Sequence, residues 1–245
     1  LVLVGCGSLG SGNQAGDPLR IGVSPNYPPV IFSKAGKLRG LEVDLGVLLA
    51  RELGRPVRFV EVPWEQQIPT LLAGDTDIIM SGMSVTPARE VRIAFADAYL
   101  TNGLVALMRS ADAERFPTVE SVLESDTSVG VIKGTTGDAF VQANMPNARN
   151  LALQRRDDVI HEFARRRIHL YIDDAAAAAY IVSQNEAEMT GLWVALEREP
   201  LAWGLRRDDP EMLATVNAIL DGWRNDGTLD RVLRRWLPFM PGVEE

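Results

Sequence analysis

The feature that most limits the fold of this chain is an alternation of strand-like and helix-like segments, which begins at Leu19. Apolar residues at positions 41, 45, 48, 49 and 53 form a helical stripe that ends at Gly54. Apolar and turn patterns predict the segments around it: a strand at 19–24, a hairpin at 28–40, a strand at 57–62, a short helix at 65–74 and a strand at 76–82. Strands and helices in this order predict a mostly parallel sheet covered by helices.

The same alternation is repeated in the second half of the chain. The predicted segments are strands at 102–108, 128–132, 151–154 and 168–172, and helices at 118–124, 135–145, 157–167 and 173–185. We then expect a strand pair at 192–196 and 201–207. Two helices follow, one from near Pro210 and one with Thr228 as its N-cap. Two sets of similar size without a low-complexity linker indicate an α/β fold.

Composition excludes several classes of function. The net charge of -8 and the pI near 4.9 argue against a nucleic-acid partner, whose phosphates would be repelled. One cysteine and two histidines, His161 and His169, are too few for a thiolate or histidine metal cage. The chain also offers no Ser-His-Asp or Cys-His set for nucleophilic catalysis. We therefore expect no metal and no cofactor.

The amino terminus formally matches a dinucleotide-binding motif, with Gly5, Gly7 and Gly10 after an apolar run. Residues 11–18 form helices poorly, so the helix that this motif requires is missing. Leu3 to Cys6 instead resembles a lipobox, in which Cys6 carries lipid after cleavage of a signal segment. The alternative is an arbitrary apolar terminus with a buried cysteine. We expect residues 1–18 to be a signal remnant and flexible tether, with the protein outside the cytoplasm.

One loop holds a candidate anion site. In doubly wound sheets, ligands bind at the carboxyl ends of the strands. There, Ser81, Gly82 and Ser84 offer hydroxyls and unobstructed backbone, and a helix is predicted to begin after Thr86. Arg89 lies near that helix start, where the dipole disfavours a cation, so an anionic partner is expected. Its planar guanidinium matches a carboxylate. The alternative partners are internal: Asp97 or Glu90.

Three further loops add complementary groups. Prolines hold Tyr27 either as a wall for a ligand or in a plain surface turn. Thr135 or Thr136 caps a predicted helix whose amides would face an anion. Asp173 and Asp174 end a strand and begin a helix, so capping explains one and leaves the other for a cation such as an ammonium. Together, the four loops describe a receptor for a zwitterion.

Five ordered motifs carry a family resemblance. They are YPPV (27–30), GLEVDLGVLLA (40–50), the long run from Trp64 to Leu100, VGVIKGTTG (129–137) and the closing segment 217–238. Across residues 19–238 the chain resembles the extracytoplasmic solute-binding proteins of ABC transporters, in the polar amino-acid branch called family 3. The resemblance implies a type II fold with two lobes, each a mostly parallel sheet flanked by helices, joined by two crossover strands. Lobe 1 would contain residues 19–102 and 201–245, and lobe 2 residues 103–200.

The resemblance also implies roles for individual residues. Arg89 would bind the ligand α-carboxylate, helped by Ser84 and the Thr136 loop. Asp174 would take the α-ammonium, and Tyr27 and Trp64 would enclose the ligand side chain. The chain departs from the family at Ser24, where many members carry an acidic residue, at Val30, which replaces a phenylalanine, and at Asp97–Tyr99, where DAY replaces DPY.

The implied function is that of a monomeric, lipid-anchored receptor, which delivers a free amino acid to a membrane-embedded ABC permease without chemistry. Two alternatives remain open. One is a dehydratase on the same scaffold, acting on prephenate-like acids with Asp173 or Asp174 as general acid. The other is a sensor module that signals its closure to a separate partner.

Overall fold

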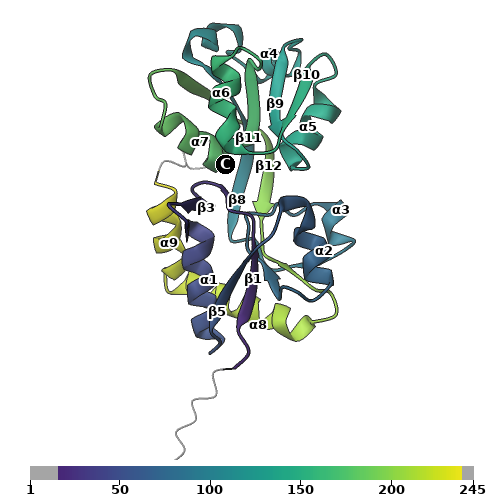
Figure 1. Ribbon diagram of the computed structural model, residues 1–245, viewed down its shortest axis with the longest axis vertical. Helices are drawn as coiled ribbons and strands as arrows, with labels where there is room; N and C mark the ends of the chain where they lie inside the picture. Colours follow the sequence, from purple (N-terminus) through teal and green to yellow (C-terminus); the bar gives the residue numbers. More distant parts are fainter. Residues whose placement is uncertain (1–15, 239–245) are drawn as a thin grey trace, which may run out of the picture.

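Two five-stranded sheets organise the computed structural model, which describes residues 16–238 (Figure 1). The strand order of the first sheet is β5 (Val57–Glu61), β1 (Leu19–Val23), β6 (Ile78–Ile79), β13 (Gly204–Leu205) and β7 (Ala94–Phe95). β1 is parallel to β5 and β6, whereas β13 is antiparallel to β6 and β7. The sheet is therefore mixed, with the predicted parallel strands β5, β1 and β6 on one side and the antiparallel pairs of β13 on the other.

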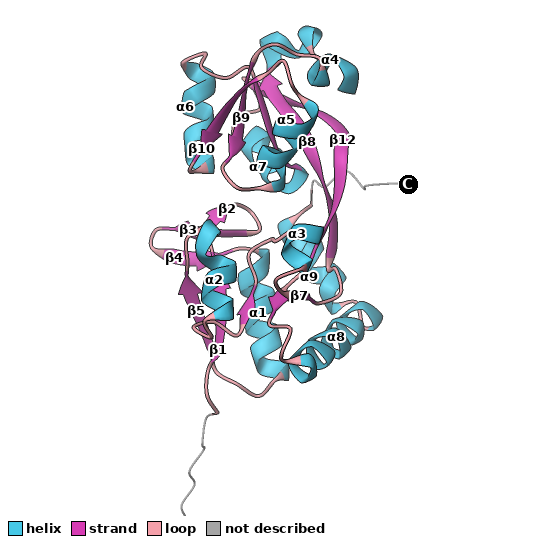
Figure 2. Cartoon of the chain, turned by 90° about the vertical axis from the view of Figure 1, so that its right-hand side faces the viewer, coloured by secondary structure: helices cyan, strands magenta, loops and turns pink. Residues whose placement is uncertain are grey.

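The strand order of the second sheet is β10 (Arg149–Leu153), β9 (Ser128–Ile132), β11 (Leu170–Asp174), β8 (Leu100–Arg109) and β12 (Met189–Leu201). Strands β9, β10 and β11 are parallel, and β8 is antiparallel to β11 and β12. In Figure 2, β8 and β12 pass from this sheet into the other half of the molecule. They are the two connections expected between the halves.

The expected strand pair at 192–196 and 201–207 is wrong. Residues 189–201 form the single strand β12, which pairs with β8 through a register shift between Leu192 and Glu197. The separate strand β13 pairs with β6 and β7 in the other sheet. β12 continues through three charged residues and Pro200, because it lies at the edge of its sheet, where charges and proline are tolerated.

Helices cover both sheets, as the apolar stripes predicted. Those of the first half are α1 (Leu41–Glu52), α2 (Gln67–Leu72), α3 (Pro87–Glu90), α8 (Pro210–Asn225) and α9 (Thr228–Trp236). Those of the second half are α4 (Val119–Leu123), α5 (Thr136–Asn144), α6 (Val159–Ala164) and α7 (Ala175–Ser183). The carboxyl-terminal α8 and α9 pack on the first half (Figure 1). Short 3₁₀ turns are present at Trp64–Gln66, Ser110–Arg115 and Arg156–Asp158.

Two local features complete the first half. A small sheet joins β2 (Asn26–Tyr27), β3 (Ile31–Lys34) and β4 (Lys37–Arg39), and its hairpin turns at Ala35 and Gly36 as predicted, with φ of 52° and 70°. Thr228 is not the N-cap of α9, because Gly227 holds that position in the left-handed region. The Asp226 carboxylate accepts the hydrogen bond from the Thr228 N–H instead, at 2.8 Å.

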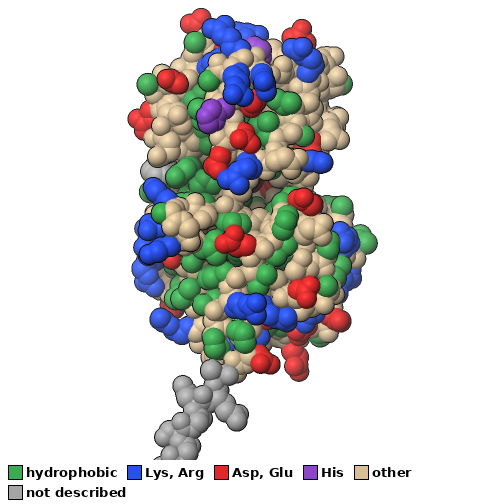
Figure 3. All heavy atoms as spheres, viewed as in Figure 1, with side chains coloured by type: hydrophobic (Ala, Val, Ile, Leu, Met, Phe, Trp, Pro, Cys, Tyr) green, Lys and Arg blue, Asp and Glu red, His purple; other side chains and the backbone are tan. Residues whose placement is uncertain are grey.

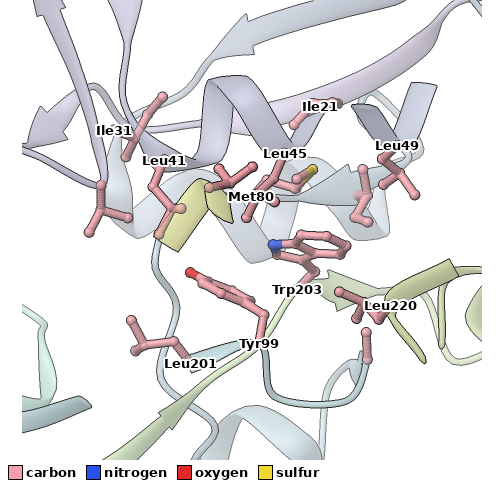
Figure 4. Close-up of a cluster of buried hydrophobic side chains, with 14 of the residues drawn as sticks. Ile21, Ile31, Leu41, Leu45, Leu49, Met80, Tyr99, Leu201, Trp203 and Leu220 are labelled. Carbon is pink, nitrogen blue, oxygen red and sulfur yellow. The ribbon is translucent and has the colours of Figure 1, made fainter. Parts of the chain in front are cut away.

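The core of the first half surrounds Trp203, whose side chain is fully buried. Its ring lies 5.5 Å from that of Tyr99, and Leu45 and Leu49 pack nearby from α1 (Figure 4). Glu42, also on α1, is fully buried in this apolar region. Its Oε1 accepts hydrogen bonds from the Gly82 N–H at 2.9 Å and the Tyr99 hydroxyl at 2.7 Å, and its Oε2 accepts one from Trp203 at 2.9 Å. Glu42 thus ties α1 to the loop that carries the predicted anion site.

Glu42 is expected to make stability depend on pH. Burial raises its pKa from 4.5 to about 7, so between these values the folded protein holds a proton that the unfolded chain has lost. The stabilisation from this proton is present below pH 4.5 and is lost as the pH rises through about 7. The loss amounts to about 3 kcal/mol. Urea unfolding at a series of pH values, for wild type and for Glu42→Gln, measures it; parallel pH profiles for the two proteins would contradict it.

Candidate ligand-binding cleft

A cavity of about 410 Å³ lies between the two halves. Its walls are loops that leave the carboxyl ends of strands: those after β1, β5 and β6 in the first half, and after β9, β10 and β11 in the second. The predicted site residues that line it are Tyr27, Trp64, Ser81, Gly82, Ser84, Arg89, Thr135, Thr136 and Asp174. Asp173 is not among the lining residues. The structure therefore brings nearly all the predicted residues to one place.

Arg89 reaches this cavity from α3, which begins after Thr86 as predicted. Its guanidinium donates to the Ser84 carbonyl at 2.7 Å and lies 5.3 Å from the centre of the Trp64 ring. Within residues 16–238 it forms no ion pair, so neither Asp97 nor Glu90 is its partner. Burial lowers the pKa of Arg89, and the negative charges of Glu199 and Asp174 offset part of this decrease. A guanidinium has five N–H donors, and most of these remain for an anion.

Asp174 and Asp173 differ in their surroundings although both are buried. Asp173 is held by Arg156, with N–O distances of 2.6 and 2.8 Å, and by the Tyr171 hydroxyl at 2.6 Å. Asp174 lines the cavity and accepts a hydrogen bond from Asn102 at 2.8 Å. Neither caps α7: Asp174 holds the N-cap position without a capping hydrogen bond. Of these two carboxylates, Asp174 lines the cavity, whereas Asp173 neutralises Arg156.

The charge of Asp174 is only partly balanced by protein groups. Arg156 lies 3.7 Å from it but donates its hydrogen bonds to Asp173. Burial, and next the charge of Asp173, raise the pKa of Asp174 to about 7. A ligand ammonium at this carboxylate would stabilise its ionised form.

The two aromatic walls each have an arginine over one face. Arg156 lies 4.2 Å from the centre of the Tyr27 ring, and Arg89 lies over Trp64. The Trp64 indole also donates to the Gly134 carbonyl at 3.0 Å, which links the first half to the second. Tyr27 is buried, which excludes the plain surface turn.

Hydroxyl groups around the cavity are mostly engaged with the protein. The Ser81 hydroxyl accepts from the Ser24 N–H at 2.8 Å, and the Thr135 hydroxyl donates to the Ile132 carbonyl at 2.7 Å without capping α5. Ser24 donates to the Val62 carbonyl at 2.7 Å and accepts from the Gln67 amide at 2.8 Å. Ser24 therefore has a structural role in the loop after β1.

Two charged residues at or near the cleft were not predicted from the sequence. Arg156 lines the cavity from the 3₁₀ turn Arg156–Asp158, and Glu199 lies on β12. Both are buried. Glu199 accepts hydrogen bonds from the Ser84 hydroxyl at 2.6 Å and the Thr136 hydroxyl at 2.7 Å. No periodic pattern in the sequence marks Glu199, because Glu197, two residues earlier and on the same face of a regular strand, is exposed.

Gly82 is expected to tolerate no side chain. Its φ is +65°, and a Cβ atom there would lie 2.6 Å from the Tyr27 ring. Gly82→Ala should therefore displace Tyr27, weaken ligand binding and cost on the order of 2 kcal/mol of stability. The control is Gly222→Ala in α8, where a Cβ meets nothing within 4 Å and alanine should stabilise the helix by about 0.5–1 kcal/mol. Thermal unfolding compares the two; equal effects would contradict this account of Gly82.

Within residues 16–238, no group of three or more His, Cys, Asp or Glu side chains could hold a metal ion, and no helix is long and apolar enough to span a membrane. On the face in Figure 3, basic and acidic side chains of the described residues are interspersed and form no broad basic surface.

Comparison with known proteins reveals relatives over nearly the whole chain. Residues 19–239 match the family model of bacterial extracellular solute-binding proteins, family 3. The histidine-binding periplasmic protein of Escherichia coli (strain K12) is 29% identical over 232 residues, which cover 90% of this chain and 88% of that protein. The lysine/arginine/ornithine-binding periplasmic protein of the same strain is 26% identical over 250 residues, which cover 97% and 95%.

Solved structures share the architecture. An ancestral amino acid-binding protein, described as a precursor of cyclohexadienyl dehydratase, superposes with a TM-score of 0.84 and 32% identity, over 89% of this chain and 95% of that one. An ancestral arginine-binding protein bound to arginine has a TM-score of 0.83 and 26% identity, over 91% and 99%.

Proposed function

Because the chain belongs to the bacterial extracellular solute-binding proteins of family 3 and has their two-lobe, type II periplasmic-binding-protein fold, we propose that it binds a free amino acid in its cleft. It would deliver this ligand to a membrane-embedded ABC importer and carry out no chemistry on it. We assign the lobes to residues 19–102 with 201–245 and to residues 103–200, with β8 and β12 as the hinge; residues 239–245 of this assignment lie outside the described residues.

One observation carries the proposal. A cation and an anion, Arg89 from the first half and Asp174 from the second, line the same cavity, and Arg89 forms no ion pair within residues 16–238. The α-carboxylate and α-ammonium of an amino acid match these two charges. Ser84 and Thr136 line the same cavity, and their backbone N–H groups would donate to the carboxylate. Tyr27 and Trp64 would cover the ligand side chain.

A thermal-shift screen tests the proposal. The protein is unfolded and refolded to remove any bound ligand, and its melting temperature is then measured with each common L-amino acid and with several opines and organic acids. A ligand at a thousand times its dissociation constant stabilises the folded protein by about 4 kcal/mol, which gives a clear shift. A shift with one or a few amino acids supports the proposal, and no shift with any amino acid contradicts it.

A dehydratase is the second candidate, favoured by the raised pKa of Asp174 in an enclosed cleft. A carboxyl group with a pKa of about 7 suits a general acid at neutral pH. The contacts of Asp174 with Asn102 and Arg156 equally suit an ammonium site, and the named family relatives are binding proteins. Incubation with prephenate and arogenate separates the two hypotheses: we expect no turnover, and product formation would establish the enzyme.

We further propose that the receptor is monomeric, lies outside the cytoplasm and is anchored by lipid on Cys6. The periplasmic relatives support the location. Cys6 lies outside the described residues, so the anchor rests on the lipobox-like sequence alone. Expression of the wild-type precursor and of its Cys6→Ser variant tests it. We expect the wild type, but not the Cys6→Ser variant, to partition into the detergent phase. Equal partition of the two proteins would contradict the anchor.

A further inference from the structure

The Glu199 carboxylate connects hydroxyl groups from both halves of the molecule. It lies on β12, one of the two strands between the halves, and its residue is 6% exposed. The same atom, Oε2, accepts from the Ser84 hydroxyl at 2.6 Å and the Thr136 hydroxyl at 2.7 Å. Ser84 follows β6 in the first half, whereas Thr136 begins α5 in the second. Both hydroxyl-bearing residues line the cavity.

The direction of these hydrogen bonds determines what the two hydroxyls offer to a ligand. A hydroxyl has one hydrogen and two lone pairs, and an ionised carboxylate only accepts. Ser84 and Thr136 therefore both donate their single hydrogen to Glu199. Only lone pairs remain, and these accept from an ammonium but cannot donate to a carboxylate. This changes the sequence-based expectation: the backbone of these residues, and not their hydroxyls, would serve the carboxylate.

Glu199 also lies next to the proposed ammonium site. Its cross-strand partner on β8 is Asn102, whose amide donates to Asp174 on β11 at 2.8 Å. Directly opposed residues of neighbouring strands share one face of a sheet. The Oδ1 atom of Asn102 is buried and meets no donor within residues 16–238. The cluster of Glu199, Asn102 and Asp174 thus holds more acceptors than donors, and an ammonium group supplies three donors.

We propose that Glu199 is a positioning residue for the ligand's α-ammonium: it holds the hydroxyl hydrogens of Ser84 and Thr136, so that both hydroxyls present lone pairs to the amino group. The inference rests on the proposed function and deepens it. Glu199 touches no ligand in this scheme. Through Glu199 the cleft would select ligands that carry an amino group. Without such a group, the hydroxyl oxygens of Ser84 and Thr136 and the Asp174 carboxylate would have no donor to bind.

Calorimetric titration of Glu199→Gln tests the proposal with two ligands: the amino acid that gives the largest thermal shift, and its desamino analogue, the same acid with hydrogen in place of the ammonium. Glutamine keeps the shape but donates an N–H to one hydroxyl and lacks the charge. Affinity for the amino acid should fall at least about tenfold, while affinity for the analogue should stay within about twofold. Glu197→Gln, an exposed carboxylate on the same strand, is the matched control and should change neither.

Equal losses for both ligands in Glu199→Gln would show a merely structural role and overturn the proposal, as would unchanged preference for the amino acid. If Glu199→Gln fails to fold, Thr136→Val gives a second test, since it removes one of the two hydroxyls at nearly constant volume. It too should weaken the amino acid selectively, and an equal loss for both ligands overturns the proposal. Absence of amino-acid binding by the wild type would instead refute the proposed function.

Discussion

Arg89→Ala is expected to weaken amino-acid binding by about a hundredfold, or roughly 3 kcal/mol. In the wild type the guanidinium makes no ion pair within residues 16–238, so its charge is available to the ligand carboxylate. Its removal leaves that carboxylate in a cleft with backbone donors only, which recovers part of the lost interaction. Calorimetric titration with the identified amino acid measures the change.

Two further variants make this prediction specific. Arg89→Lys keeps the charge but loses the planar pair of donors and the stacking on Trp64, so an intermediate loss is expected. Arg92→Ala removes an exposed arginine three residues further along and should leave affinity unchanged. Wild-type affinity in Arg89→Ala would show that the carboxylate binds elsewhere.

Asp174→Asn is expected to produce the second large loss, again roughly a hundredfold. The substitution keeps the size of the side chain and removes the charge that would face the ammonium. It should also change the pH dependence of binding. Burial raises the pKa of Asp174 to about 7, so the wild type should bind amino acids more weakly as the pH falls below this value and the carboxylate takes up a proton.

Titrations between pH 5 and 8 measure this effect, with roughly one pH unit between points. The Asn variant has no carboxylate at this position and should lose the part of the pH profile that Asp174 contributes. Asp126→Asn, which changes an exposed carboxylate before β9, is the control and should retain the wild-type profile. A wild-type profile in Asp174→Asn would assign the titrating group to another residue.

The sequence predicted the architecture well where the periodic patterns were long. The stripe of leucines in α1 and the five motifs led to the correct helices, strands and family, and the four loops at strand ends contain most of the residues that line the cleft. These features are local: a stripe or a strand end can be recognised without knowledge of its partners.

The features that were predicted wrongly or missed share a physical cause: their structure depends on contacts with other residues of the fold, most of them distant in the chain. Residues 192–196 and 201–207 were predicted as a strand pair, because the continuity of β12 up to Leu201 depends on pairing with β8. Arg156 and Glu199 were not predicted as buried residues, because their burial depends on Asp173 in one case and on Ser84 and Thr136 in the other. Thr228 was a plausible cap until Asp226 and Gly227 were seen to fill that role. Such groups gain meaning only from tertiary contacts.

A crystal structure of the refolded protein with the amino acid that gives the largest thermal shift tests the central claim most directly. The account predicts one amino acid in the cleft, with its carboxylate hydrogen bonded to Arg89 and its ammonium to Asp174. A ligand bound in the opposite orientation, or bound outside the cavity between the two halves, would contradict it.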